Sequence, residues 1–75
     1  MTRLRKVSGE ETLRALERLG FVRARQRGSH VVLKRTTPEG DLGCVVPLHH
    51  ELAIGTLSSI LKQARVTIEE FSNNL

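Results

Sequence analysis

Histidines are the residues of this 75-residue chain that could exchange a proton near neutral pH, and there are three: His30, His49 and His50. His49 and His50 are adjacent, and neighbours in an extended segment point apart, which makes them a poor pair of metal ligands. No set of acidic residues accompanies them, and the single cysteine, Cys44, excludes a cysteine-based zinc site and an internal disulfide. We therefore expect no metal and no cofactor, and interpret both loop histidines as hydrogen-bonded surface groups.

A predicted β-hairpin surrounds His30 with basic side chains. Residues 21–26 and 29–34 have the composition of strands, and Arg27-Gly28 is expected to form the two-residue loop between them. This register pairs Arg25 with His30 and sorts the side chains into two faces, which a slip of one residue would mix. The apolar face collects Val22, Ala24, Val31 and Leu33. The other face collects Phe21, Arg23, Arg25, His30, Val32 and Lys34. Because arginine is a poor first residue for a tight turn, a bulge at the loop is an alternative.

The charges of the chain are unevenly distributed. Residues 1–35 hold ten basic and three acidic side chains, a balance of +7, whereas residues 36–75 hold two basic and five acidic, a balance of −3. A basic half is typical of proteins that bind a polyanion such as nucleic acid, although a charge that serves only solubility is the alternative. With no Trp or Tyr to stack on bases, recognition would rest on phosphate, ribose and shape, which disfavours an RRM or a cold-shock fold.

The remaining elements are predicted from capping, periodicity and turn residues. Helices are expected over 9–19, over 56–65 and, in a shorter form, after Thr67, with Ser8–Glu11 and Thr67–Glu70 as capping boxes. A turn-rich loop over 36–41, a strand over 43–47 and a loop over 48–55 complete the chain. The order is α-β-β-β-α with a short extra C-terminal helix, so we expect an α+β fold with helices on one face of a three-stranded antiparallel sheet. His30 and the arginines would lie on the open face.

The chain is expected to form one domain, 1–75, with a basic tail over 1–6 and a core over 7–71. No apolar run approaches the ~20 residues that span a bilayer, and the first residues lack the apolar stretch of a signal peptide. A cytoplasmic protein without a membrane partner is the expectation.

A series of short motifs, in order and at short spacings, closely resembles the HicA (YcfA-like) family of mRNA interferase toxins. The motifs are Leu19-Gly-Phe-Val22, Arg25-Gln-Arg-Gly-Ser-His30, Val46-Pro-Leu-His49, Glu51-Leu52, Gly55-Thr-Leu57 and Ile60-Leu-Lys-Gln-Ala64. The likeness covers residues 7–71. Many relatives have Lys before Gly-Ser-His where this chain has Arg27, and Gly where it has Arg65; the tail residues Arg3, Arg5 and Lys6 are unmatched.

The resemblance implies a fold like the double-stranded RNA-binding domain and a toxin of a toxin–antitoxin system, an endoribonuclease that cleaves mRNA and inhibits translation. It also implies a HicB-type antitoxin that covers the active site. The family's catalytic histidine corresponds to His30, and this outweighs the simpler interpretation of His30 as a solvated strand residue. Contacts to RNA are expected from Arg23, Arg25, Arg27, Ser29 and Lys34, while His49 is given no catalytic role.

The expected reaction needs no metal. His30 acts as general acid or base while the ribose 2′-oxygen attacks the adjacent phosphorus, and a second acid or base group is required that the sequence does not name. The competing interpretation is a non-catalytic RNA-binding module that uses the same basic face. A third is a protein adaptor, which would have no affinity for RNA.

Overall fold

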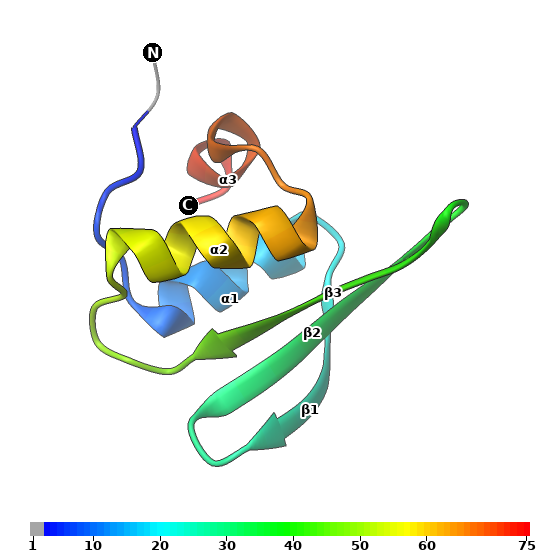
Figure 1. The fold of residues 1–75 in the computed structure, drawn as a ribbon, viewed down its shortest axis with the longest axis horizontal. Helices are drawn as coiled ribbons and strands as arrows, with labels where there is room; N and C mark the ends of the chain where they lie inside the picture. Colours follow the sequence, from blue (N-terminus) through cyan, green and yellow to red (C-terminus); the bar gives the residue numbers. More distant parts are fainter. Residues whose placement is uncertain (1–2) are drawn as a thin grey trace.

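A computed structural model describes residues 3–75, and it confirms the α+β architecture (Figure 1). The elements are α1 (Gly9–Arg18), β1 (Val22–Arg27), β2 (His30–Thr37), β3 (Gly40–Pro47), α2 (Ile54–Ala64) and α3 (Ile68–Asn73). The strands form one antiparallel sheet in the order β1-β2-β3. Helices α1 and α2 lie together on one side of this sheet and leave the other side open. Of the predicted basic tail, residues 1–2 lie outside the described residues.

Both predicted capping boxes are present. At the start of α1 the Glu11 amide donates to the Ser8 hydroxyl at 3.0 Å, and the Ser8 amide donates to the Glu11 carboxylate at 2.9 Å. This bond from the Ser8 amide lowers the pKa of Glu11 below its ordinary value. Thr67 and Glu70 make the same reciprocal pair at α3. The helix starts therefore lie where local sequence chemistry predicts them, except that α2 begins at Ile54, two residues early.

The predicted register of the first hairpin is wrong. The two-residue turn is Gly28-Ser29, so that Arg27 pairs with His30, and Arg25 pairs with Val32 rather than with His30. Gly28 has φ +58 at the first turn position, where type II′ hairpins prefer glycine. The alternative of a bulge at the loop is also wrong, because the irregularity lies between Arg23 and Arg25.

The bulge changes which face several side chains occupy. Regular alternation would put Arg23 and Arg25 on one face, but the extra residue makes Arg23 pair with Leu33, on the helix-covered face. Val22 consequently pairs with Lys34 and is 63% exposed rather than in the core. Phe21, predicted on the open face, is buried in the core. Ala24, predicted on the apolar face, is the extra residue of the bulge and is exposed. The placements of Phe21, Val22, Arg23 and Ala24 are thus corrected, while Arg25, Val32 and Lys34 lie on the open face as predicted.

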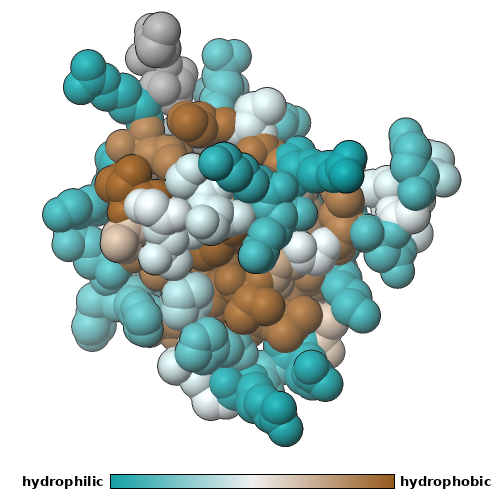
Figure 2. Space-filling view, viewed as in Figure 1, coloured by the Kyte–Doolittle hydropathy of each residue, from teal (hydrophilic) through white to brown (hydrophobic). Residues whose placement is uncertain are grey.

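The second hairpin is longer than predicted. β2 continues to Thr37 and β3 starts at Gly40, so the expected loop over 36–41 reduces to the turn Pro38-Glu39. Gly40 has φ +125, and the Thr37 hydroxyl donates to its carbonyl at 2.6 Å. This end of the hairpin extends past the helices (Figure 1). Figure 2 shows hydrophilic and neutral side chains at the two hairpin turns, at the bottom and right of the view.

The hydrophobic core lies between the sheet and the helices. β2 contributes Val31 and Leu33, each fully buried, and these alternate with the less buried His30, Val32 and Lys34. The other buried apolar residues are Val7, Leu13, Ala15, Leu16, Phe21, Cys44, Val46, Leu52, Leu57, Ile60, Leu61, Ala64, Val66 and Phe71. All core side chains of the sheet thus point toward the helices, which leaves the opposite face free for function.

Arg65 caps the C-terminus of α2 in the left-handed conformation, with φ 55 and ψ 41. A side chain in that region costs about 1–2 kcal/mol, and glycine avoids this cost at the expense of a more flexible unfolded chain. We therefore expect Arg65→Gly to raise the free energy of unfolding by about 0.5–1 kcal/mol in urea titrations. A loss of stability in this variant would show that Arg65 makes contacts worth more than the backbone strain.

Candidate nucleic-acid interface

His30 lies at one end of the open face, between the two outer strands. It is the first residue of β2 and is exposed, with Arg27 of β1 directly opposite on one side and Pro47 of β3 on the other. Directly opposed residues have Cβ atoms about 4.5–5.5 Å apart. Arg27 is therefore the cation closest in register to His30, a place that the predicted register assigned to Arg25.

Two further cations continue the basic side of this face. Arg25 lies opposite Val32, one row beyond His30, and Lys34 lies opposite Val22, in the next row. A hollow of about 230 Å³ opens between them, lined by Ala24, Arg25, Val32 and Lys34. The β3 side of the same rows carries Val45 and Gly43, without charge. In these rows the open face is basic along β1 and β2 and uncharged along β3, and the row beyond them pairs Thr36 with the acidic Asp41.

The cations of the open face have no acidic partner in the described part of the chain. Within residues 3–75, the ion pairs closer than 4.0 Å involve Lys6, Arg14 and Arg23 as cations. Arg25, Arg27 and Lys34 make none of these pairs, and each is exposed. Their charges are therefore available to a phosphate group.

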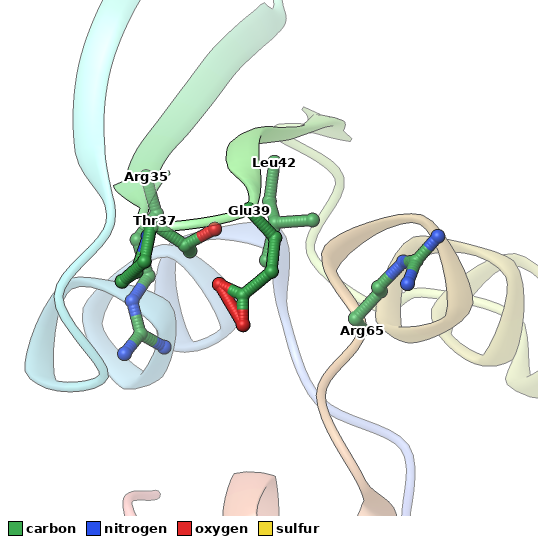
Figure 3. A pocket seen from close by; sticks show the side chains of 6 residues that line it. Arg35, Thr37, Glu39, Leu42 and Arg65 are labelled. Atoms are coloured by element: carbon green, nitrogen blue, oxygen red, sulfur yellow. The ribbon is translucent and has the colours of Figure 1, made fainter.

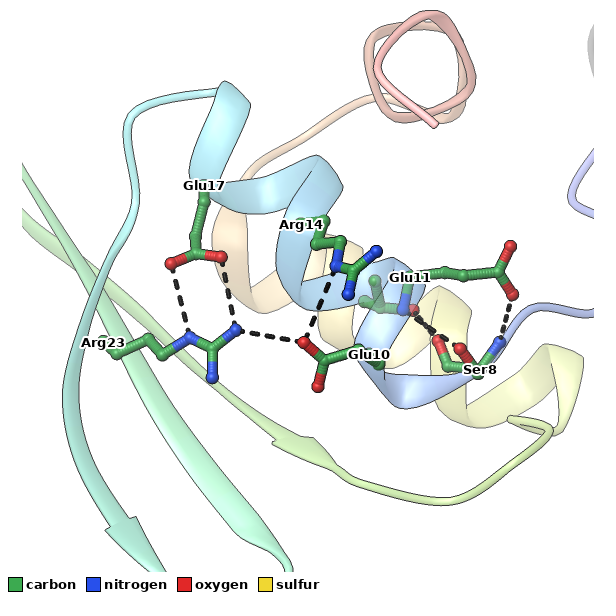
Figure 4. Close-up of polar contacts among 7 residues, drawn as sticks. Ser8, Glu10, Glu11, Arg14, Glu17 and Arg23 are labelled. Carbon is green, nitrogen blue, oxygen red and sulfur yellow. Dashed lines mark hydrogen bonds and ion pairs between the residues drawn. The ribbon is translucent and has the colours of Figure 1, made fainter.

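Arg23 makes a different set of contacts. Its guanidinium lies against α1, where Nε is 3.3 Å from Glu17 Oε2 and Nη2 is 3.3 Å from Glu10 Oε1 (Figure 4). The hydrogen bond to Glu17 raises the pKa of Arg23 further above its ordinary value. These contacts tie β1 to α1, so the structure brings Arg25, Arg27, Ser29, His30 and Lys34 together at the open face and leaves Arg23 apart.

The segment after β3 is held next to His30 by its backbone. The Leu48 amide donates to the Ser29 carbonyl at 2.7 Å, and the Gly9 amide of α1 donates to the His49 carbonyl at 2.8 Å. A Cβ atom on Gly9 would overlap the Pro47 carbonyl oxygen and lie 2.9 Å from the Leu48 Cα. The loop that carries His49 is thus clamped between the first hairpin turn and α1. Sequence patterns did not predict this, although a glycine at the first position of a helix indicates a close approach.

A second hollow lies apart from the open face, between the projecting hairpin and the end of α2 (Figure 3). Its volume is about 390 Å³, and its lining residues are Arg35, Thr37, Pro38, Glu39, Leu42 and Arg65. The Arg65 side chain points away from Glu39 in this view. Acidic and basic groups are mixed here, whereas the charged side chains in the rows of His30, Val32 and Lys34 on the open face are all basic.

The other chemically reactive groups offer no second centre. Burial raises the pKa of the Cys44 thiol to about 11, so it is protonated near neutral pH and is no nucleophile. Across residues 3–75, no three His, Cys, Asp or Glu side chains gather into a set that could hold a metal ion. In the same range no helix is long and apolar enough to cross a membrane.

Comparison with known proteins places the chain in a family. A family model described as HicA toxin of bacterial toxin-antitoxin systems matches residues 9–66, which run from the start of α1 to just beyond α2. No curated protein matches the chain. The matched range includes the sheet, both core helices and the His30 face, so the protein belongs to the HicA toxin family of bacterial toxin–antitoxin systems.

Proposed function

We propose that this toxin is a metal-independent endoribonuclease that cleaves mRNA and inhibits translation, with His30 as its catalytic residue. The observation that carries this proposal is the position of His30: an exposed imidazole with Arg27 directly opposite, in a face whose cations lack acidic partners. Membership of a toxin family supports an activity that harms the cell. A HicB-type antitoxin is the proposed partner, and it would neutralise the toxin by covering this face.

The proposed reaction is an internal transfer at phosphorus. His30 accepts the proton of the ribose 2′-hydroxyl, the 2′-oxygen attacks the adjacent phosphorus, and the bond from phosphorus to the 5′-oxygen breaks. The products are a 2′,3′-cyclic phosphate and a free 5′-hydroxyl. The reaction requires RNA, since DNA has no 2′-hydroxyl.

The arginines stabilise the charge that develops at phosphorus. Arg27 is the cation adjacent to His30, while Arg25 and Lys34 lie one and two rows farther along the face. Fixed cations placed where negative charge develops can lower a barrier by several kcal/mol. We assign Arg27 to the reacting phosphate and the other two to neighbouring phosphates, with Ser29 beside the reacting group in the turn.

The bulge in β1 leads to a prediction about RNA affinity. Arg27→Ala and Arg25→Ala should each weaken RNA binding and reduce the slope of log K against log salt by about 1. Arg23→Ala removes a cation of equal charge from the same strand but from the helix side, so it should leave that slope unchanged and reduce stability by at most about 1 kcal/mol. Fluorescence anisotropy with labelled RNA at several salt concentrations measures all three. If Arg23→Ala reduced the slope as much as the other two variants do, the assignment of RNA binding to the open face would be contradicted.

The test of the proposed activity uses purified protein and end-labelled mRNA in excess EDTA. Cleavage that persists in EDTA and is inhibited by added salt is the expected result. Cleavage abolished by EDTA and restored by a divalent cation would overturn the metal-independent mechanism. Binding without any cleavage would favour the alternative, a non-catalytic RNA-binding module, which the same unpaired cations would also serve.

A further inference from the structure

An internal transfer at phosphorus moves two protons, and one histidine does not readily serve both ends of the step. The 2′-oxygen must lose a proton on one side of the phosphorus, and the leaving 5′-oxygen must gain one on the other side. On the open face, the row of His30 and the next row contain Arg27, Pro47, Arg25, Val32 and Val45, none of which readily gives up a proton near neutral pH, and Lys34 lies a further row away. The second group therefore has to come from outside the strands.

The clamped loop after β3 brings such a group to the same end of the sheet. Pro47 is the direct neighbour of His30 across the sheet, and His49 is two residues farther along the chain. Opposed Cα atoms lie about 4.5–5.5 Å apart, and two residues span at most about 7 Å. The Cα atoms of the two histidines are thus within about 12 Å, a span that two imidazole side chains with one phosphodiester between them can fill.

The restraints on the loop also favour His49 over its neighbour. Leu48 is partly buried against the core, and Pro47 before it is buried, so the start of the loop is packed against the rest of the protein. His49 is exposed, and its own carbonyl accepts the bond from the Gly9 amide, whereas His50 is one residue farther from His30 along the chain. Backbone bonds to Ser29 and Gly9 fix this segment on both sides, which is more restraint than an ordinary surface loop requires.

We propose that His49 is the second catalytic residue and donates a proton to the leaving 5′-oxygen, while His30 takes the proton of the 2′-hydroxyl. This role is one step of the proposed cleavage reaction, so it depends on that activity. The proton lost by the 2′-oxygen goes to His30, the new bond joins the 2′-oxygen to phosphorus, and the electron pair of the broken bond goes to the 5′-oxygen, which His49 protonates.

The charged groups around the two histidines differ. Arg27 faces His30 from β1, so a cation lies directly beside the proposed proton acceptor. The loop of His49 carries Glu51, paired with Lys6 at 3.8 Å, and it contacts the first turn of α1, which holds Glu10 and Glu11. Acidic side chains thus lie in the elements around the proposed proton donor, whereas a cation lies opposite the proposed acceptor.

The experiment compares His49→Gln with the matched control His50→Gln on two substrates. One is an mRNA fragment, whose leaving alkoxide needs a proton. The other is a set of nucleoside 3′-(4-nitrophenyl phosphates), whose leaving phenolate needs none. We expect His49→Gln to lower kcat on RNA by at least about 10²-fold and to change the nitrophenyl reaction less than about threefold. His30→Gln should slow both reactions, and His50→Gln neither.

The pH dependence gives an independent readout that a structural role would not change. The wild-type rate on RNA should fall at both low and high pH, and His49→Gln should lose the fall at high pH, which reports the acid. Two results for His49→Gln would overturn the role of His49. One is an equal loss of rate on both substrates with the falls at low and high pH both retained, and the other is an unchanged rate on RNA. If wild type and the His30 variant both fail to cleave RNA, the proposed function itself fails.

Discussion

His30→Ala should lower kcat for RNA cleavage by about 10²–10⁴-fold, the range that a positioned acid or base contributes, and leave RNA affinity within about twofold. The residue is exposed at the start of β2, and within residues 3–75 its side chain makes no hydrogen bond, so its removal should leave the fold intact. Cleavage rates under single turnover, binding anisotropy and a circular dichroism spectrum measure the three quantities.

The control for this variant is His50→Ala, which removes an exposed imidazole from the neighbouring loop. Wild-type cleavage in His50→Ala with loss in His30→Ala separates the enzyme from a passive binding module, because both share the same cations. Undiminished cleavage by His30→Ala would refute the catalytic assignment. Loss of binding together with cleavage would give His30 a role in affinity instead.

Gly9→Ala should destabilise the fold by at least about 2 kcal/mol, although alanine is normally the better helix residue. The added methyl group would overlap the Pro47 carbonyl and press on the Leu48 Cα, and both neighbours are backbone atoms that cannot rotate away. The resulting shift should also break the bond from the Gly9 amide to His49. Urea unfolding measures the loss of stability, and RNA cleavage measured well below the midpoint shows the effect on the loop.

Gly55→Ala provides the matched control, because Gly55 lies in the first turn of α2 and a Cβ atom there meets nothing within 4 Å. The free energy of unfolding of Gly55→Ala should be no lower than that of the wild type and at most about 1 kcal/mol higher. Equal stabilities for Gly9→Ala and the wild type would mean that the segment after β3 is not held as closely as the structure shows.

The parts of the fold predicted correctly from sequence depend on local chemistry. The capping boxes at Ser8 and Thr67 need residues only three positions apart, and both form as predicted. The bulge near Ala24 depends on distant groups instead, since it lets Arg23 reach Glu10 and Glu17 while Phe21 enters the core. No local pattern in β1 indicates those contacts. The turn at Gly28 is easier to predict from sequence, because type II′ turns prefer glycine at the first loop position.

The length of the second hairpin was missed for another physical reason. Its outer part, from Lys34 to Thr37 on β2, is polar and mostly exposed, so it lacks the alternation that identifies a half-buried strand. The ladder to β3 supports it instead of core packing. Strands of this kind can be predicted only from their turn, and the turn residues Pro38-Glu39-Gly40 are equally compatible with a longer loop.

The predicted grouping of Arg25 and His30 on one face is present despite the wrong register. Near the turn the error is two residues, which preserves the face of each side chain, so Arg25 and His30 share the open face in both arrangements. What changes is the neighbour of His30, now Arg27. The position of His49 relative to His30 required the pairing of β2 with β3 and the contacts of Gly9, neither of which sequence spacing contains.

The chemical nature of the cleaved ends tests the central proposal most directly. RNA cut by the wild-type protein in excess EDTA should carry a 2′,3′-cyclic phosphate on one fragment and a 5′-hydroxyl on the other, because the attacking oxygen is the neighbouring 2′-oxygen. Kinase labelling of the new 5′ ends without prior phosphatase treatment, together with mass spectrometry of the 3′ ends, identifies both groups. A 5′-phosphate with a free 3′-hydroxyl would require an attacking water and would contradict the mechanism assigned to His30.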